Sequence, residues 1–287
     1  VYTSNAQSSL NVCYNNLDNY LATLSNAIVT PHPSYAQFDV TENGERAQLN
    51  DSLLQIENEF YSPIRPKRVA QSGEAPIVAL KRGGIEYIEI RCIDINPFLP
   101  LGIDAQTMRL IDVFLVDAIL SESPLCDEDG QRRNQENLRR VVNEGRSPDL
   151  QLLTPEGEKP LQTVAQELFD SMSKTAEAMD AEAGSDLHQQ AMTAASARIV
   201  DPESTPSGRV LQEMRDTNTP FWQLALNYSK QWHKGHLARP LGSIEEAEFH
   251  TATAVSLNQQ KAMEQDTQES FQTYLDRFYN QYRGADD

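Results

Sequence analysis

The sequence has few basic residues for its length. Its 287 residues include 24 lysines and arginines against 42 aspartates and glutamates, so the formal net charge is -18 at pH 7. Nucleic acids and anionic membranes bind positively charged protein surfaces, and this balance argues against either as the main partner. No apolar run approaches the roughly 18 residues that a membrane-spanning helix needs. The composition predicts a soluble protein.

Cysteine is also scarce. The three cysteines, Cys13, Cys92 and Cys126, are an odd number at spacings that match no disulfide or zinc framework. The chain also has no signal-like amino terminus. These features predict a reduced, cytoplasmic protein without disulfides, in which Cys92 packs on the apolar face of a strand.

Several common catalytic motifs are absent. The sequence contains no Gly-x-Ser-x-Gly, no Gly-rich loop ending in Gly-Lys-Ser/Thr and no Cys-x-x-Cys. His233 and His236 lie one helical turn apart, but no third ligand candidate is near them in the sequence, so they are expected at the surface.

The first hundred residues carry the strand signals. Phe38 and Val40 alternate with polar neighbours before Asn43-Gly44, a dipeptide suited to a two-residue type I′ turn, and Ala47 and Leu49 continue the alternation. This pattern predicts a hairpin.

Two further strands are expected. Residues 53–61 alternate, with the polar side chains of Gln55, Glu57, Glu59 and Tyr61 on one face. Residues 84–95 follow Gly83-Gly84 and alternate too, with Ile88, Ile90 and Cys92 on one face and Tyr87, Glu89 and Arg91 on the other.

Beyond residue 103 the apolar spacing becomes helical. A helix is expected over residues 105–121 after Asp104, a second after Pro160, and a long final helix from Ser243. An aromatic stripe near its end is expected to pack against other helices; it comprises Phe271, Tyr274, Leu275, Phe278 and Tyr282. The chain is therefore expected to be α+β, with a strand-rich part at residues 1–103 and a mainly helical part at residues 104–287.

One acidic and one basic residue are candidates for chemistry. Glu89 and Arg91 lie two apart on an expected strand, so both side chains leave the same face. Carboxylate oxygens suit Mg²⁺, and a guanidinium can hold two phosphate oxygens, so the pair suits metal-assisted phosphoryl transfer. A cross-strand salt bridge on a solvated sheet face is the competing interpretation.

Two long motifs in this region resemble those of a known family. They are Leu54-Gln-Ile-Glu-Asn-Glu-Phe-Tyr61-Ser-Pro-Ile-Arg65-Pro-Lys-Arg68 and Arg82-Gly-Gly-Ile-Glu-Tyr-Ile-Glu89-Ile-Arg91-Cys-Ile-Asp-Ile-Asn-Pro97. Both are similar to the signature of the proteobacterial type of glutamate-cysteine ligase (γ-glutamylcysteine synthetase), and the likeness fades after about residue 215. The resemblance implies an antiparallel sheet of the glutamine-synthetase-like kind in the front part.

The resemblance also implies an activity, the ATP-dependent joining of the glutamate γ-carboxylate to the cysteine amine through a γ-glutamyl phosphate, the first step of glutathione biosynthesis. By the same likeness, Glu89 corresponds to a Mg²⁺ ligand, Arg91 to the arginine that contacts the transferred phosphoryl group, and Tyr2 and Tyr61 to tyrosines of the cysteine pocket. Arg65 and Arg68 belong to the motif without an assigned contact.

Members of that family are longer than this chain, and their amino-terminal half supplies further carboxylate ligands. The resemblance therefore implies a carboxyl-terminal portion that lacks ligase activity alone. Two alternatives stay open: a related carboxylate-amine ligase with another amine acceptor, and a non-catalytic, acidic, helical interaction module.

Overall fold

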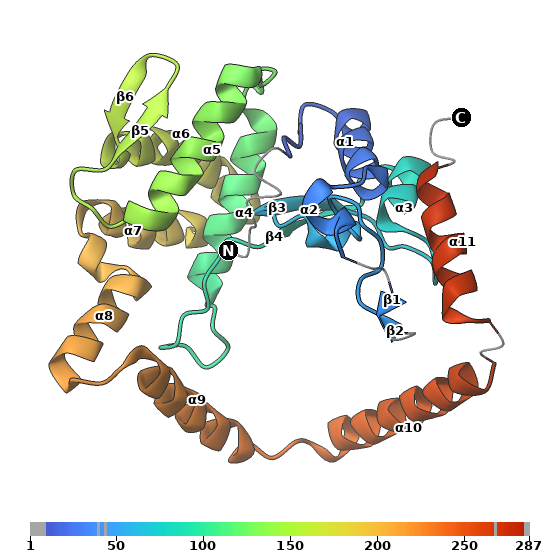
Figure 1. The fold of residues 1–287 in the computed structure, drawn as a ribbon. Helices are drawn as coiled ribbons and strands as arrows, with labels where there is room; N and C mark the ends of the chain where they lie inside the picture. The colour runs from blue at the N-terminus through green and yellow to red at the C-terminus, as the bar shows by residue number, and fades with distance from the viewer. Residues whose placement is uncertain (1–9, 39–40, 43–44, 267–268, 284–287) are drawn as a thin grey trace. The chain divides into compact units, whose positions relative to one another are not determined.

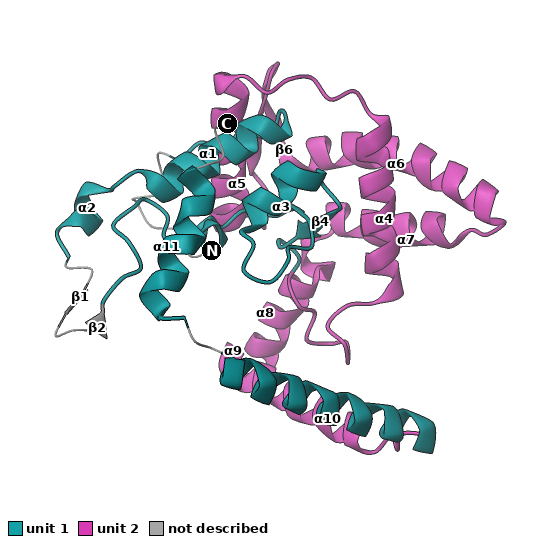
Figure 2. Ribbon diagram, turned by 90° about the vertical axis from the view of Figure 1, so that its right-hand side faces the viewer, with its two compact units in different colours: residues 1–93, 243–287 teal, residues 94–242 magenta. Residues whose placement is uncertain are grey.

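The computed structural model describes residues 10–38, 41–42, 45–266 and 269–283, and over these residues the chain is mostly helical (Figure 1). Its strands form three separate two-stranded antiparallel sheets. The chain divides into two compact units, residues 1–93 with 243–287 (unit 1) and residues 94–242 (unit 2), which Figure 2 colours separately. The α+β expectation is confirmed as a mostly helical chain with small antiparallel sheets.

Unit 1 combines short strands with helices from both ends of the chain. Its elements are α1 (Leu17–Val29), α2 (Pro33–Ala36), β1 (Thr41–Glu42), β2 (Glu45–Arg46), the 3-10 turn η2 (Glu57–Glu59), β3 (Ile64–Lys67), α3 (Pro76–Gly83), β4 (Tyr87–Ile90), α10 (Ser243–Asp266) and α11 (Phe271–Arg283).

Unit 2 is a helical assembly with one hairpin. Its elements are α4 (Ala105–Leu120), α5 (Glu128–Glu144), β5 (Gln151–Thr154), β6 (Gly157–Pro160), α6 (Leu161–Ala183), α7 (Leu187–Val200), the 3-10 turn η3 (Pro202–Ser204), α8 (Pro206–Thr217) and α9 (Phe221–Leu237). Among the described residues of both units, no helix is long and apolar enough to cross a membrane.

The core of unit 1 is built on α1. Asn16 caps this helix by accepting a hydrogen bond from the Asn19 amide. Its buried residues recur at helical spacing. With residues of the loop after β2, of α3 and the position before it, and of α11, they form one cluster: Tyr20, Leu21, Leu24, Ala27, Ile28, Leu54, Ala75, Ile77, Leu80 and Tyr282. The carboxyl-terminal helix α11 is therefore part of the unit 1 core.

The core of unit 2 lies between α4, α6 and α7. Val113, Met172, Ala176 and Met192 form its buried cluster. The predicted helices after Asp104 and after Pro160 are confirmed as α4 and α6, and the Asp104 side chain accepts a hydrogen bond from the Thr107 amide as an amino-terminal cap.

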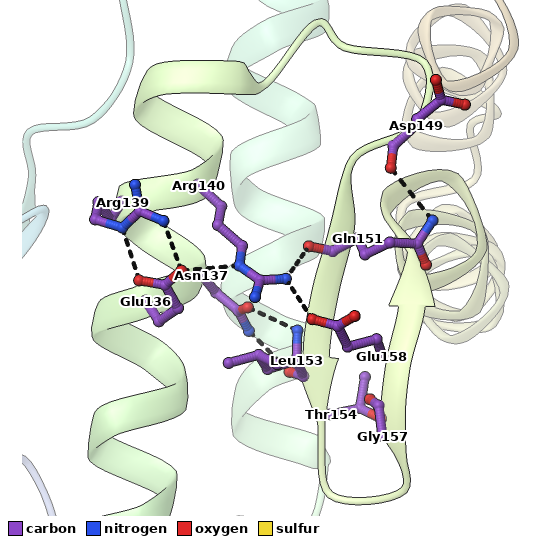
Figure 3. A network of polar contacts seen from close by, with 10 residues as sticks. All are labelled: Glu136, Asn137, Arg139, Arg140, Asp149, Gln151, Leu153, Thr154, Gly157 and Glu158. Carbon is purple, nitrogen blue, oxygen red and sulfur yellow. Dashed lines mark hydrogen bonds and ion pairs between the residues drawn. The ribbon is translucent and has the colours of Figure 1, made fainter.

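A polar network holds the β5–β6 hairpin against α5 (Figure 3). The Asn137 side chain donates to the Leu153 carbonyl at 2.9 Å and accepts from the Leu153 amide at 2.8 Å. Arg140 donates to the Gln151 carbonyl at 2.8 Å and to Glu158 at 2.9 Å. Side chains of α5 therefore form hydrogen bonds with backbone groups along the edge of β5.

Residues 53–61 do not form the expected strand, so that prediction is wrong. Backbone groups there bond to other partners: the Leu54 amide donates to the Ala27 carbonyl, the Gln55 amide to the Glu59 side chain, and the Gln55 carbonyl accepts from the Tyr279 hydroxyl. A chain whose backbone groups are satisfied in this way has none left for a strand ladder. The strand begins later, at Ile64.

The expected hairpin near residue 43 is confirmed as a shorter one. Thr41 pairs with Arg46 and Glu42 with Glu45, antiparallel. The turn residues Asn43-Gly44 lie outside the described residues, as does Val40.

The segment that was expected to form one long final helix forms two helices, α10 and α11. It begins at Ser243 as predicted, but α10 ends at Asp266 and the aromatic stripe lies on α11. Leu275 and Tyr282 are buried, and Phe278 packs against the unit 1 core, whereas Phe271 is exposed. The packing role of the stripe is confirmed for its carboxyl-terminal part.

Candidate functional site

The candidate site lies on the β3–β4 ribbon. In the antiparallel register Arg65 is opposite Glu89, and Lys67 is opposite Tyr87. Directly opposed residues share a face, so these side chains and those at alternate positions leave the ribbon together. Arg91 follows the end of β4, where its amide donates to the Pro63 carbonyl at 2.7 Å.

Glu89 lies between two cations. One of its oxygens is 3.8 Å from Arg91 Nε and the other is 3.7 Å from Lys67 Nζ. The Glu89 side chain is 38% exposed, and those of Lys67 and Arg91 are each 27% exposed. The prediction that Glu89 and Arg91 leave the same face is confirmed. Ion pairs as exposed as these contribute about 0–1 kcal/mol to stability. The Lys67–Glu89 pair between the two strands also fits the competing salt-bridge interpretation.

Tyr61 adds an aromatic surface to this cluster. The Arg91 guanidinium carbon lies 4.5 Å from the centre of the Tyr61 ring, a cation–π contact. Tyr61 comes from the loop between η2 and β3, and it remains accessible to solvent. Tyr2, the other expected pocket residue, lies outside the described residues.

Arg65 lies beneath the cluster and is buried, with 5% of its surface exposed. Its Nη2 donates to the Asn58 carbonyl at 3.1 Å, and its Nε has no hydrogen-bond partner within the described residues. Burial, followed by the charge of nearby Arg91, lowers the pKa of this guanidinium. Two guanidinium groups and Lys67 therefore share this region with the Glu89 carboxylate and, on the buried side, with Glu57. Guanidinium groups suit an anion with several oxygens.

Glu57 is not part of the polar face on which it was expected. Its side chain is buried in unit 1, and both carboxylate oxygens lie 3.2 Å from the Ile77 amide in the first turn of α3. Burial raises the pKa of Glu57 to about 7, although the Ile77 hydrogen bond opposes the shift. Glu57 therefore caps a helix.

The described residues offer no complete metal site. Within the part of the chain that the structure describes, no group of three or more histidine, cysteine, aspartate or glutamate side chains could hold a metal ion. Mg²⁺ is commonly bound by one or two carboxylates with phosphate oxygens and water completing the shell. Glu89 fits the role of one such carboxylate.

Lys67 was missed as a neighbour of Glu89. The sequence pattern predicted a strand at residues 53–61 and none at residues 64–67, whereas the partner of β4 is β3, which carries Lys67. The signal that could have found it is the run Ile64-Arg65-Pro66-Lys67, in which charged residues alternate with apolar ones.

Two minor expectations have different outcomes. Cys92 is exposed, so its expected packing role is wrong; β4 ends at Ile90 and the alternation does not extend to residue 92. His233 and His236 are exposed on α9, as predicted.

Comparisons with known proteins agree on one family. The family model described as glutamate-cysteine ligase matches residues 1–141. The glutamate–cysteine ligase of Pseudomonas paraeruginosa is 40% identical over 274 residues, which are 96% of this chain and 52% of the relative. That of Janthinobacterium is 41% identical over 280 residues, covering 98% of this chain and 53% of the relative. The chain thus spans about half the length of these curated relatives.

Solved structures give the same result. A crystal structure of glutamate–cysteine ligase from Francisella tularensis in complex with AMP matches with a TM-score of 0.90 and 28% identity, covering 98% of this chain and 56% of that one. A bifunctional glutathione synthetase from Pasteurella multocida matches with a TM-score of 0.53 and 19% identity, which shows a likeness of fold alone.

Proposed function

Because nearly the whole chain is similar to glutamate-cysteine ligases, we propose that it belongs to this family and is the carboxyl-terminal portion of a cytoplasmic enzyme that joins the glutamate γ-carboxylate to the cysteine amine at the expense of ATP. The γ-carboxylate attacks the terminal phosphoryl group of ATP, and ADP leaves. The cysteine amine then attacks the resulting acyl phosphate and displaces inorganic phosphate. Neither step needs a protein nucleophile, which suits a site that offers charged side chains.

One observation carries the proposal. Glu89 and Arg91 leave the same face, 3.8 Å apart, on a strand flanked by Lys67. Arg91 contacts the phosphoryl group in transfer and offsets the charge that accumulates on its oxygens. The Tyr61 ring beneath Arg91 restricts the guanidinium on one side. By the family likeness, Tyr61 and Tyr2 correspond to tyrosines of the cysteine pocket.

Glu89 would hold Mg²⁺ as one of its protein ligands. Bound there, the ion screens the repulsion between the glutamate carboxylate and the ATP oxygens. Lys67 and Arg91 flank the Glu89 carboxylate, one near each of its two oxygens.

The remaining half of the relatives' length supplies the further carboxylates of the site. A single carboxylate between two cations is a poor metal site by itself. We therefore expect the 287-residue chain alone to release no phosphate from ATP in the presence of glutamate and cysteine. We also place residues 1–103 and 104–287 in the same catalytic domain.

The test is product formation by the enzyme expressed from the whole reading frame that encodes this chain. With ATP, Mg²⁺, glutamate and cysteine, we expect γ-glutamylcysteine and phosphate in equal amounts. Arg91→Lys is expected to lower kcat at least about tenfold, because an ammonium cannot hold two phosphate oxygens as the guanidinium fork does. Arg82→Lys, a surface exchange of the same kind on α3, is the matched control.

A panel of amine acceptors separates this proposal from its alternative. Cysteine as the preferred acceptor supports the ligase named here, whereas another preferred amine indicates a related carboxylate-amine ligase. An enzyme that makes no amide bond with any acceptor refutes the proposal.

A further inference from the structure

We infer that Arg68 is a positioning residue that fixes the register of β4 and thereby places Glu89 and Arg91. The consequence for catalysis rests on the function proposed above, whereas the register itself is a property of the chain and can be measured separately. Arg68 is the first residue after β3, and it does not touch Glu89 or Arg91 in any contact of the structure.

The Arg68 guanidinium contacts the backbone at the turn that leads into β4. Its Nε donates to the Gly84 carbonyl at 2.7 Å, and its Nη2 donates to the Gly83 carbonyl. Its Nη1 lies 3.6 Å from a Glu86 oxygen, and that same oxygen accepts a hydrogen bond from the Val69 amide at 3.2 Å. We call this set of contacts, made by Arg68 with Gly83, Gly84 and Glu86, the Arg68 clamp.

The clamp lies at the end of a helix. α3 ends at Gly83, and Gly84 follows with a φ of +72° that favours glycine. The last carbonyls of a helix lack partners within it and carry partial negative charge, so a guanidinium satisfies them well. The Glu86 amide then donates to the Lys67 carbonyl at 2.9 Å, and the ladder of β3 and β4 begins.

The ladder itself specifies its register weakly. It pairs only four residues on each strand, and one of them, Pro66, has no amide to donate. Burial fixes Arg65 of β3, but it adds little on β4, where Tyr87 and Ile88, on opposite faces, are both exposed. A strand of this kind can slip by one residue, and a slip of one residue moves every side chain to the other face.

A slip would separate the two candidate groups from their surroundings. Glu89 would leave the face on which Lys67 lies 3.7 Å away, and Arg91 would leave the Tyr61 ring. The clamp prevents this at the start of β4, three residues before Glu89, while the bond from the Arg91 amide to the Pro63 carbonyl holds the other end.

Gly83 provides an independent way to disturb the clamp. A Cβ added there would lie 2.5 Å from Arg68 Nε and 2.6 Å from its Cζ, and no other atom is as near. An alanine at this position therefore displaces the Arg68 side chain. The three atoms nearest to that Cβ all belong to Arg68, so a chain without this side chain removes the obstacle, and alanine suits a helix better than glycine.

The experiment is a double-mutant cycle read by hydrogen exchange of the peptide covering residues 85–91. We expect Arg68→Ala to speed exchange of these amides about tenfold or more, since bonds from a charged donor to two carbonyls are lost. Gly83→Ala is expected to act in the same direction, and the two changes together should exchange no faster than Arg68→Ala alone. Arg82→Ala, which removes an ion pair that Arg82 of the same helix makes with Glu74, is the matched control and should leave this peptide unchanged.

An unchanged exchange rate in Arg68→Ala would overturn the inference. So would a double variant in which Gly83→Ala speeds exchange as much as it does in the wild-type chain. If Arg68→Ala does not fold, Arg68→Lys serves in its place: it keeps the charge and one donor, and an intermediate exchange rate is expected. In the enzyme expressed from the whole reading frame, Arg68→Ala is expected to lower kcat about tenfold at an unchanged folded fraction, with part of it restored in Arg68→Lys. An enzyme without ligase activity would refute the proposed function, whereas the exchange cycle would still decide the role of Arg68.

Discussion

Replacing Glu57 with glutamine tests the most perturbed carboxyl group at the base of the site. Glu57 is 7% exposed and accepts the Ile77 amide hydrogen bond with both oxygens. Glutamine has nearly the same shape and keeps one carbonyl oxygen for that bond, but it cannot ionise. The substitution therefore removes a buried charge while it leaves the helix cap largely in place.

The magnitude follows from the pKa. Burial raises the pKa of Glu57 from its ordinary 4.5 to about 7. Between these values the folded chain keeps the proton that the unfolded chain has released, so the free energy of unfolding falls as pH rises through this window and is level above it. At about 1.4 kcal/mol for each pH unit, the loss amounts to about 3 kcal/mol.

The assay has to report on unit 1. Both tryptophans, Trp222 and Trp232, lie in unit 2, so their fluorescence does not serve. Hydrogen exchange of the buried α1 amides, measured between pH 5 and pH 8 and corrected for intrinsic rates, gives the local free energy directly.

We expect the wild-type protection to fall across the window and Glu57→Gln to remain level, with higher protection than wild type at pH 8. Glu264→Gln on the exposed face of α10 is the control and should follow wild type. A Glu57→Gln variant with the wild-type dependence on pH would refute the claim that this carboxyl group is protonated by burial.

Two further predictions concern packing. Leu54→Ala should lower the free energy of unfolding of unit 1 by about 2–5 kcal/mol, since Leu54 is fully buried in its core, and chemical denaturation followed by exchange of the α1 amides measures it. Asn137→Ala should lower the free energy of unfolding of unit 2 by about 1–3 kcal/mol, because both backbone groups of Leu153 lose their hydrogen-bond partner. The midpoint of urea unfolding, followed by tryptophan fluorescence, measures this change. Asn143→Ala on the exposed side of α5 is the control. A change of less than about 0.5 kcal/mol in either would contradict the packing described here.

The sequence patterns that succeeded are local ones. The apolar spacing of α4 and its Asp104 cap are properties of neighbouring residues, and so is the alternation that places Glu89 and Arg91 on one face. Such signals do not depend on which segment lies next to them.

The patterns that failed depend on distant partners. Residues 53–61 alternate like a strand, yet their backbone groups bond to α1 and α11, one of them more than two hundred residues away. Helix α5 and the β5–β6 hairpin went unpredicted because α5 is mostly polar, and its contact with the hairpin rests on hydrogen bonds from Asn137 and Arg140. Alternation cannot identify a strand's partner, which is why Lys67 was missed.

The most direct measurement of the central claim is a calorimetric titration of the enzyme expressed from the whole reading frame with ATP in the presence of Mg²⁺. If Arg91 holds the phosphate oxygens, Arg91→Ala weakens binding about 10- to 100-fold, the loss that accompanies a charge-assisted contact, while Arg82→Ala binds like wild type. An Arg91→Ala variant with wild-type affinity for the nucleotide would contradict the assignment of this strand face to phosphate binding.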